Sequence, residues 1–229
     1  MFDKNGKEIK DWNPKISGSK ILSQIEHFNI KKQDYLVYAD SQQINFVDRK
    51  GKSRLKPCKG NTPGTNFKVF YTNEKSNEHF IYTDRNGTIR FLYLNGKCDS
   101  LSLGQFTEKH HFIYANWDGK AGKEYIFIDN DNIKVYSGKN LIYTNQLPGK
   151  TKFEPILFNL PRNESGIGLV FDDQNQLILF SKAGKIPASF PLNGDSYFTI
   201  YFQSVGKLMG YQVICGSKNA LINYPVSLQ

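Results

Sequence analysis

The 229-residue chain contains very little methionine, tryptophan and cysteine, with two Met, two Trp and three Cys. No apolar run approaches the ~18 residues that a membrane-spanning helix requires. The N-terminal residues Met-Phe-Asp-Lys-Asn-Gly contain no apolar segment of the kind that a secretory signal carries. None of the cysteines belongs to a Cys-x-x-Cys pair, and three cysteines cannot form a disulfide framework. We therefore expect Cys58, Cys98 and Cys215 to be reduced thiols.

Motifs of the common enzyme classes are also missing. The sequence contains no phosphate-cradling glycine loop, no dinucleotide-binding fingerprint and no signature of a Ser-His-Asp triad. Its four histidines form no metal-binding motif, and adjacent residues such as His110 and His111 point to opposite faces of a strand. We therefore expect neither a zinc site nor a cofactor.

The composition is that of a soluble globular protein rich in β-strand formers. Hydrophobic residues make up 39% of the chain and charged residues 22%, which argues against disorder. The 17 phenylalanines and 13 tyrosines favour strands. Apolar residues alternate or run together without a sustained helical period, so we expect an all-β fold.

Two markers recur along the chain with a period of about 44 residues. One is the apolar residue that opens a strand after a polar turn; its intervals are 45, 44, 44 and 44, and its positions are Ile44, Ile89, Ile133, Leu177 and Leu221. The other is an aromatic residue further upstream, at Phe28, Tyr71, Tyr114, Phe158 and Phe202. Because the two markers keep step over five units, the chain is predicted to contain five structural repeats.

Each repeat is predicted to contain four short strands. In the second repeat these are residues 67–71, 79–83, 88–93 and 97–103, separated by polar and glycine-bearing turns of hairpin type. Repeats of ~40–50 residues with four strands are the signature of a β-propeller blade. The strand-turn-strand pattern of the repeats resembles the blades of bacterial propellers of the quinoprotein-like and WD-repeat-like kinds. That resemblance covers nearly the whole chain, and it implies a propeller fold and an extracytoplasmic location in the periplasm or cell envelope.

The two ends of the chain carry complementary parts of one repeat. Residues 1–12 match the stretch that begins at Phe46, with Asp3 over Asp48 and Gly6 over Gly51, whereas the fifth repeat stops near the end of its third strand. We therefore predict a single domain over residues 1–229. It is a five-bladed β-propeller of four-stranded antiparallel blades, in which the N-terminal strand completes the last blade and removes an exposed edge. The alternative is that the five repeats belong to a larger ring.

Two acids are candidates for catalytic groups. Aligning the first strands on the aromatic marker places Glu26 in a tier that is otherwise apolar, and Glu154 lies two residues earlier in its own repeat. Paired carboxylates across a channel would indicate a glycosidase. A one-residue slip in the first repeat would instead place Ile25 in that tier and turn Glu26 aside. His27 and His110 are also expected on first strands, where a channel role is the alternative to ordinary packing.

Acidic turns and a basic stretch supply the remaining candidates. Asp129 and Asp131 are the pair to test for a metal, although Asp and Asn are also the residues that hairpin turns require. The densest positive charge in this chain of net charge +9 lies between residues 49 and 59. Its candidate anion ligands are Arg49, Lys50, Lys52, Arg54 and Lys56. Edge-strand protection explains the same charges. The basic stretch contains no aromatic residue after Phe46 on which bases could stack, so we do not expect specific nucleic-acid binding.

The sequence thus favours a binding protein over an enzyme. We expect a non-enzymatic, monomeric scaffold that engages a protein or a glycan through loops on one face of the ring, because fold alone does not determine function and no catalytic constellation is evident. The alternatives are a carbohydrate-active enzyme with channel carboxylates and a polyanion-binding module.

Overall fold

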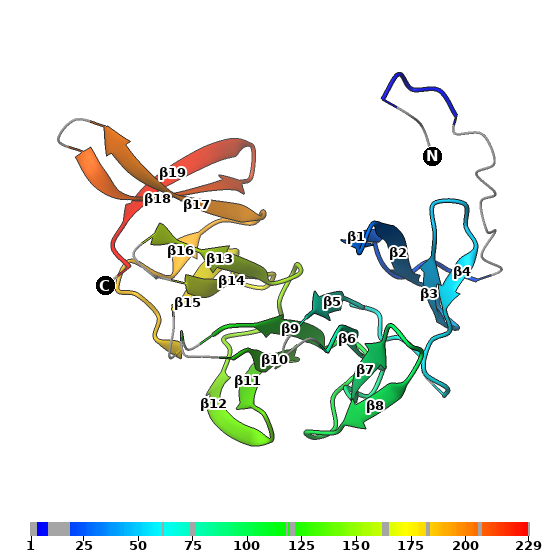
Figure 1. Ribbon diagram of the computed structural model, residues 1–229. Helices are drawn as coiled ribbons and strands as arrows, with labels where there is room; N and C mark the ends of the chain where they lie inside the picture. The colour runs from blue at the N-terminus through cyan, green and yellow to red at the C-terminus, as the bar shows by residue number, and fades with distance from the viewer. Residues whose placement is uncertain are drawn as a thin grey trace. The chain divides into compact units, whose positions relative to one another are not determined.

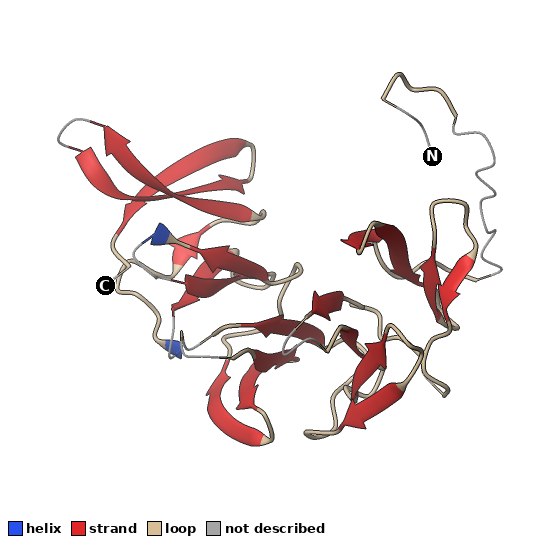
Figure 2. Cartoon of the chain, viewed as in Figure 1, coloured by secondary structure: helices blue, strands red, loops and turns tan. Residues whose placement is uncertain are grey.

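The computed structural model describes residues 4–8, 19–60, 62–73, 77–117, 119, 122–161, 165–181, 184–205 and 208–228. Within these ranges the regular structure consists of 19 β-strands with essentially no helix (Figure 2). Among the described residues, no helix has the length and apolar character needed to cross a bilayer. The expectation of an all-β fold is confirmed.

The first two sheets are antiparallel, and strands that follow one another in sequence are neighbours in each (Figure 1). The first sheet consists of β1 (Glu26–Ile30), β2 (Gln33–Ala39), β3 (Ile44–Val47) and β4 (Ser53–Leu55). The second consists of β5 (Val69–Thr72), β6 (His79–Thr83), β7 (Ile89–Tyr93) and β8 (Cys98–Leu101).

The remaining three sheets repeat this order, and the last one has three strands among the described residues. The third consists of β9 (His111–Ala115), β10 (Glu124–Asp129), β11 (Asn132–Ser137) and β12 (Asn140–Gln146). The fourth consists of β13 (Ile156–Asn159), β14 (Ser165–Phe171), β15 (Gln176–Ser181) and β16 (Leu192–Asn193). The fifth consists of β17 (Phe198–Val205), β18 (Leu208–Ser217) and β19 (Ala220–Val226).

Both sequence markers fall where the repeat predicts. All five aromatic markers lie on the first strand of a sheet, and all five apolar markers lie at the start of a third strand. The chain divides into two compact units, Met1–Phe112 and Ile113–Gln229. The prediction of one domain over the whole chain stays a prediction.

Turns between third and fourth strands use glycine in the left-handed region. Gly51 and Gly96 have φ of 75° and 85°, and each donates its backbone N–H to the carbonyl oxygen three residues earlier, at Asp48 and Tyr93. Gly6 has the same φ of 75°. Only glycine adopts this conformation at little cost. The described residues 4–8 therefore share the glycine conformation of the turn that the sequence alignment assigned to them, while residues 9–12 lie outside the described residues.

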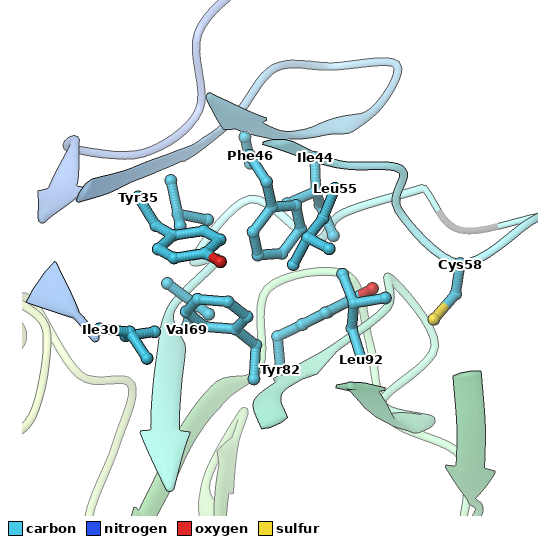
Figure 3. Packing of buried hydrophobic residues seen from close by; sticks show 12 residues of the cluster. Ile30, Tyr35, Ile44, Phe46, Leu55, Cys58, Val69, Tyr82 and Leu92 are labelled. Carbon is cyan, nitrogen blue, oxygen red and sulfur yellow. The ribbon is translucent and has the colours of Figure 1, made fainter. Parts of the chain in front are cut away.

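The core of the N-terminal unit is the contact between the first and second sheets. One face of the first sheet contributes Ile30, Tyr35 and Phe46, which pack against Val69 and Tyr82 of the second sheet (Figure 3). Phe80 is fully buried and its ring lies near four others, those of Phe28, Tyr35, Phe46 and Tyr71, with centroids 5.1–5.6 Å apart. Each large side chain buried in this way stabilises the fold by ~1.5–3 kcal/mol.

The fourth and fifth sheets pack together in the same manner within the C-terminal unit. Leu177 and Leu179 on β15 join Ile200 on β17 and Val213 and Cys215 on β18 in one buried cluster. Two aromatic rings pack closely on Gly168 of β14. A Cβ atom at this position would lie 2.5 Å from the Phe198 ring and 2.6 Å from the Phe158 ring, so a larger residue would not fit without a shift. Strand order and face-to-face packing are therefore repeated in both units.

The expectation of three reduced thiols is wrong. Cys58 and Cys98 form a disulfide, with Cα atoms 5.8 Å apart, and Cys215 is free and buried. Cys58 follows the outermost strand of the first sheet, and Cys98 opens the outermost strand of the second. The packing of two successive sheets brings these residues together across 40 positions of sequence, a proximity that cysteine spacing alone does not reveal.

We expect Cys98→Ser to lower the free energy of unfolding by about 2–4 kcal/mol, because the disulfide restricts a long loop in the unfolded chain. Cys98 is exposed, so the serine itself adds little cost. Denaturant titration of the variant and parent measures the difference. As a control, alkylation of the unreduced parent in denaturant should modify one thiol; modification of all three would contradict the disulfide.

Candidate functional site

The predicted anion ligands lie together at one end of the first sheet. Arg49, Lys50 and Lys52 belong to the turn between β3 and β4, Arg54 lies in β4, and Lys56 follows that strand. All five are exposed. This placement on the outer hairpin and outermost strand is the one that the repeat predicted. We call this group, with the β1–β2 turn beside it, the basic end of the first sheet.

Asp48 organises the turn that carries these cations. Its Oδ1 accepts hydrogen bonds from the backbone N–H groups of Lys50 and Lys52, at 2.8 and 2.9 Å. Burial favours a higher pKa for the Asp48 carboxyl. The two N–H groups and the charges of Arg54 and Lys52 outweigh that effect, so its pKa lies below its ordinary value. The carboxylate therefore stays ionised and partly neutralises the positive turn.

Asp34, at the start of β2, is the second acid of the basic end. Its Oδ1 lies 2.9 Å from Asn29 Nδ2 and 2.8 Å from His27 Nε2, and its Oδ2 lies 2.5 Å from Arg49 Nε. The Asp34 side chain is only 10% exposed, against 67% for Arg49. The hydrogen bond from Asn29, then that from His27 and the charge of Arg49, lower the pKa of Asp34. Arg54 also donates from Nε to the Asp34 carbonyl at 3.2 Å.

The turn between β1 and β2 presents two further lysines. Lys31 and Lys32 have φ of 49° and 64°, a conformation uncommon for residues other than glycine. The Lys31 ammonium forms an ion pair with Glu78, which also accepts a hydrogen bond from the Tyr71 hydroxyl at 3.1 Å. Burial, followed by the bond to Glu78, raises the pKa of Tyr71 to about 12. Sequence reasoning missed Lys31 and its acid partner, because they come from different repeats.

Two cations of the basic end, Arg49 and Lys31, are held in ion pairs, whereas Lys50, Lys52 and Lys56 are exposed. The Asp34 carboxylate pairs with Arg49, the Asp34 backbone carbonyl accepts a hydrogen bond from the Arg54 side chain, and Glu78 pairs with Lys31. An incoming anion would compete with these acids for Arg49 and Lys31. The geometry favours edge protection by charge, and polyanion binding by Arg49 to Lys56 stays a prediction.

The candidate catalytic acids lie in different units. Glu26 is half-buried on β1, on the same face as Phe28 and Ile30, whereas the neighbouring Ile25 is 61% exposed. The structure therefore does not have the one-residue slip that would place Ile25, in place of Glu26, on this face. Glu154 is exposed in the segment before β13. A catalytic role for either residue stays a prediction.

The aspartates of the strand-connecting turns bind backbone groups. Asp84 Oδ1 accepts from the N–H groups of Asn86 and Thr88, at 3.0 and 3.1 Å, and its Oδ2 accepts from Arg90 Nη2 at 2.7 Å. Asp131 instead accepts a hydrogen bond at Oδ1 from the side-chain Nδ2 of Asn132 at 2.7 Å, and Asp129 is the last residue of β10. No group of three or more His, Cys, Asp or Glu side chains among the described residues is arranged to hold a metal. The metal candidates Asp129 and Asp131 remain a prediction.

His110 lies in the loop just before β9, which begins at His111, and it is 3% exposed. Its Nδ1 lies 2.6 Å from the Thr107 carbonyl oxygen, and its Nε2 lies 2.8 Å from Thr83 Oγ1. A neutral imidazole protonated on Nδ1 satisfies both contacts, with the threonine hydroxyl as donor. The placement of His110 on a first strand is wrong, and the residue connects the loop to β6.

No protein-family model matches the chain, and no curated protein is detectably similar to it in sequence. Similar folds occur among solved structures. BBS1N, crystallised in complex with ARL6DN and soaked with lead, matches with a TM-score of 0.57 at 12% identity, over 90% of this chain and 65% of BBS1N. A protein of unknown function from Bacteroides caccae matches with a TM-score of 0.52 at 12% identity, over 98% of this chain and 84% of that protein. Raptor from Chaetomium thermophilum matches with a TM-score of 0.52 at 10% identity, over 92% of this chain and 21% of Raptor.

At these identities the likeness concerns the fold alone. The neighbours, together with the repeated antiparallel sheets, support a β-propeller-like fold. This chain spans 65% of the length of BBS1N.

Among the described residues of the N-terminal unit, five carboxyl groups have a lowered pKa: Asp34, Asp40, Asp48, Glu78 and Asp99. A depressed pKa in the folded state gives stability that is present above the unfolded value, ~3.9 for Asp, and is lost as pH falls through the folded value. We therefore expect residues 19–112 to lose hydrogen-exchange protection progressively below about pH 4.

Exchange followed by mass spectrometry across a pH series checks this prediction. Asp34→Asn should make the acid-induced loss smaller, because one of the five linked groups is removed. Earlier loss of protection in residues 113–228 as pH falls would contradict it.

Proposed function

We propose that this chain is a non-enzymatic binding module, a propeller whose strand-connecting loops engage a protein or a glycan. The observation that supports it is the use of the acidic side chains. The carboxylates of Asp40, Asp48, Asp84 and Asp195 accept hydrogen bonds from backbone N–H groups of turns. Acids used in this way hold loops in one conformation, and preformed loops bind a partner at a lower entropic cost.

The neighbouring structures are compatible with such a role. BBS1N was crystallised in a complex with ARL6DN. A single propeller that presents loops to one partner needs no self-association, so we propose a monomer. The Cys58–Cys98 disulfide favours an oxidising compartment, such as the periplasm or cell envelope.

We further propose that the fifth sheet is completed by the N-terminal segment, giving a closed ring of five blades. The fifth sheet has three described strands where the other four have four, and Leu221 on its last strand is 79% exposed. β19 contains no charged residue to protect its edge. Residues 7–12 would supply the missing strand after the Gly6 turn. The alternative, five blades of a larger ring, leaves β19 open to a further segment.

Deletion of residues 1–12 should destabilise the protein by several kcal/mol. We expect Trp12 to pack inward in the completed blade, so losing its burial contributes ~1.5–3 kcal/mol, and the broken ladder of hydrogen bonds adds to it. Total stabilities are ~5–15 kcal/mol, so the truncated chain should melt much earlier or aggregate. Thermal unfolding compares it with the parent and with a control that lacks residues 1 and 2 only. A full deletion that melts with the parent would contradict closure.

The enzymatic alternative is tested with the two candidate acids. We expect purified protein to release no fragments from a bound glycan, and neither Glu26→Gln nor Glu154→Gln to change that result. Glu26→Val should melt at or above the parent temperature, because a half-buried carboxylate near apolar neighbours is costly. Glycan fragments released by the parent but not by Glu26→Gln would overturn the proposal of a non-enzymatic module.

A further inference from the structure

Two stacked aromatic rings lie at the surface of the C-terminal unit. Phe153, in the segment between β12 and β13, and Tyr197, in the segment between β16 and β17, have ring centroids 4.6 Å apart and an interplanar angle of 26°. Phe153 is half-buried and packs against the core of the fourth and fifth sheets. Tyr197 is 53% exposed. We call this pair the aromatic platform, with Tyr197 as its open face.

The platform is held in place from both sides. On the Phe153 side, the N–H of Lys152 bonds the Val170 carbonyl oxygen at 2.7 Å, which fixes the segment to β14. On the Tyr197 side, the N–H of Asp195 bonds the Gly216 carbonyl oxygen at 3.0 Å, and the N–H of Gly216 bonds Ser196 Oγ at 2.6 Å. The ring of Tyr197 is thus presented by two anchored segments, so little order has to be gained on binding.

Polar groups border the platform. The Lys152 ammonium lies 5.6 Å from the centre of the Phe153 ring and 3.4 Å from Asp172 Oδ1, and Asp172 is 63% exposed. The exposed Glu154 follows Phe153 directly in the chain. The Tyr197 hydroxyl makes no hydrogen bond to another described residue, so it can bond a ligand.

We propose that the aromatic platform binds a neutral sugar ring of a glycan. The face of an aromatic ring is electronegative and attracts the weakly positive C–H groups that line one face of a sugar. The Tyr197 hydroxyl and the Asp172 carboxylate supply hydrogen-bonding partners for the hydroxyl groups at the sugar edge. A few polar groups around an apolar surface are the usual composition of a small-ligand site. This inference rests on the proposed binding function and assigns its ligand class.

The charges at the platform favour a neutral ligand over a nucleic acid or a sulfated polymer. Lys152, whose ammonium lies 5.6 Å from the centre of the Phe153 ring, is paired with Asp172, and the exposed acid Glu154 is the next residue in the chain after Phe153. A phosphate or sulfate would find this cation already paired and would be repelled by the Asp172 carboxylate. Binding should therefore depend weakly on salt, unlike binding to polyanions.

The test is an array of neutral hexose and N-acetylhexosamine oligomers, followed by calorimetry on the bound oligomers. Tyr197→Ala should weaken binding at least about tenfold, as truncation of an exposed aromatic anchor does. Tyr197→Phe keeps the ring and should remain within about threefold of the parent. Tyr201→Ala is the matched control, because Tyr201 is a 38% exposed tyrosine on β17 of the same unit. Thermal unfolding verifies that each variant is folded.

Binding lost in Tyr197→Ala and kept in Tyr201→Ala supports the platform. Neutral-glycan binding that Tyr197→Ala leaves intact overturns the platform while the binding module stands. Binding only to polyanions or to a peptide also overturns the platform and leaves the proposed function in place. Cleavage of the bound oligomer, with Tyr197→Ala still impaired, supports the platform and overturns the proposed function.

Discussion

The fold depends on face-to-face burial between successive small sheets. A sheet of four short strands cannot bury its apolar residues by itself, so it needs another sheet against it. All four residues of β3 are buried, and Phe80 on β6 is surrounded by rings from the first and second sheets. The period of about 44 residues is the length of chain required to build one such sheet and return to begin the next. The disulfide between Cys58 and Cys98 connects two of these sheets at their outer strands.

The loops follow from the same constraint. The apolar residues are used between sheets, and the turns satisfy part of their backbone N–H groups with their own side chains. Asp40, Asp48 and Asp84 do this for three turns of the N-terminal unit, and left-handed glycines such as Gly51 complete the geometry. Under the proposed binding function, the partner meets the side chains that these loops present, and the stacked Phe153 and Tyr197 are the feature to which we assign that role.

Much of the architecture could be predicted from the sequence, because strand alternation and repeat spacing are local properties. The marker residues Phe28 and Ile44 identified first and third strands correctly, and β6 has the predicted bounds of 79–83. Contacts between repeats could not be predicted. The disulfide, the pairing of Lys31 with Glu78 and the stacking of Tyr197 on Phe153 each join residues at least 40 positions apart, whose proximity depends on packing. Strand boundaries could not be predicted to the residue either: His110 was expected on a first strand, but β9 begins one residue later, at His111.

Residue-resolved hydrogen exchange along β19 tests the central claim that every sheet of this repeat is completed to four strands. In an edge strand, alternate N–H groups face away from the neighbouring strand and exchange quickly. The account predicts slow exchange at successive residues of Ala220–Val226, other than Pro225, as in the central strand β18. Fast exchange at alternate residues of β19 would mean that its outer edge is open, and would contradict the closed ring of five blades.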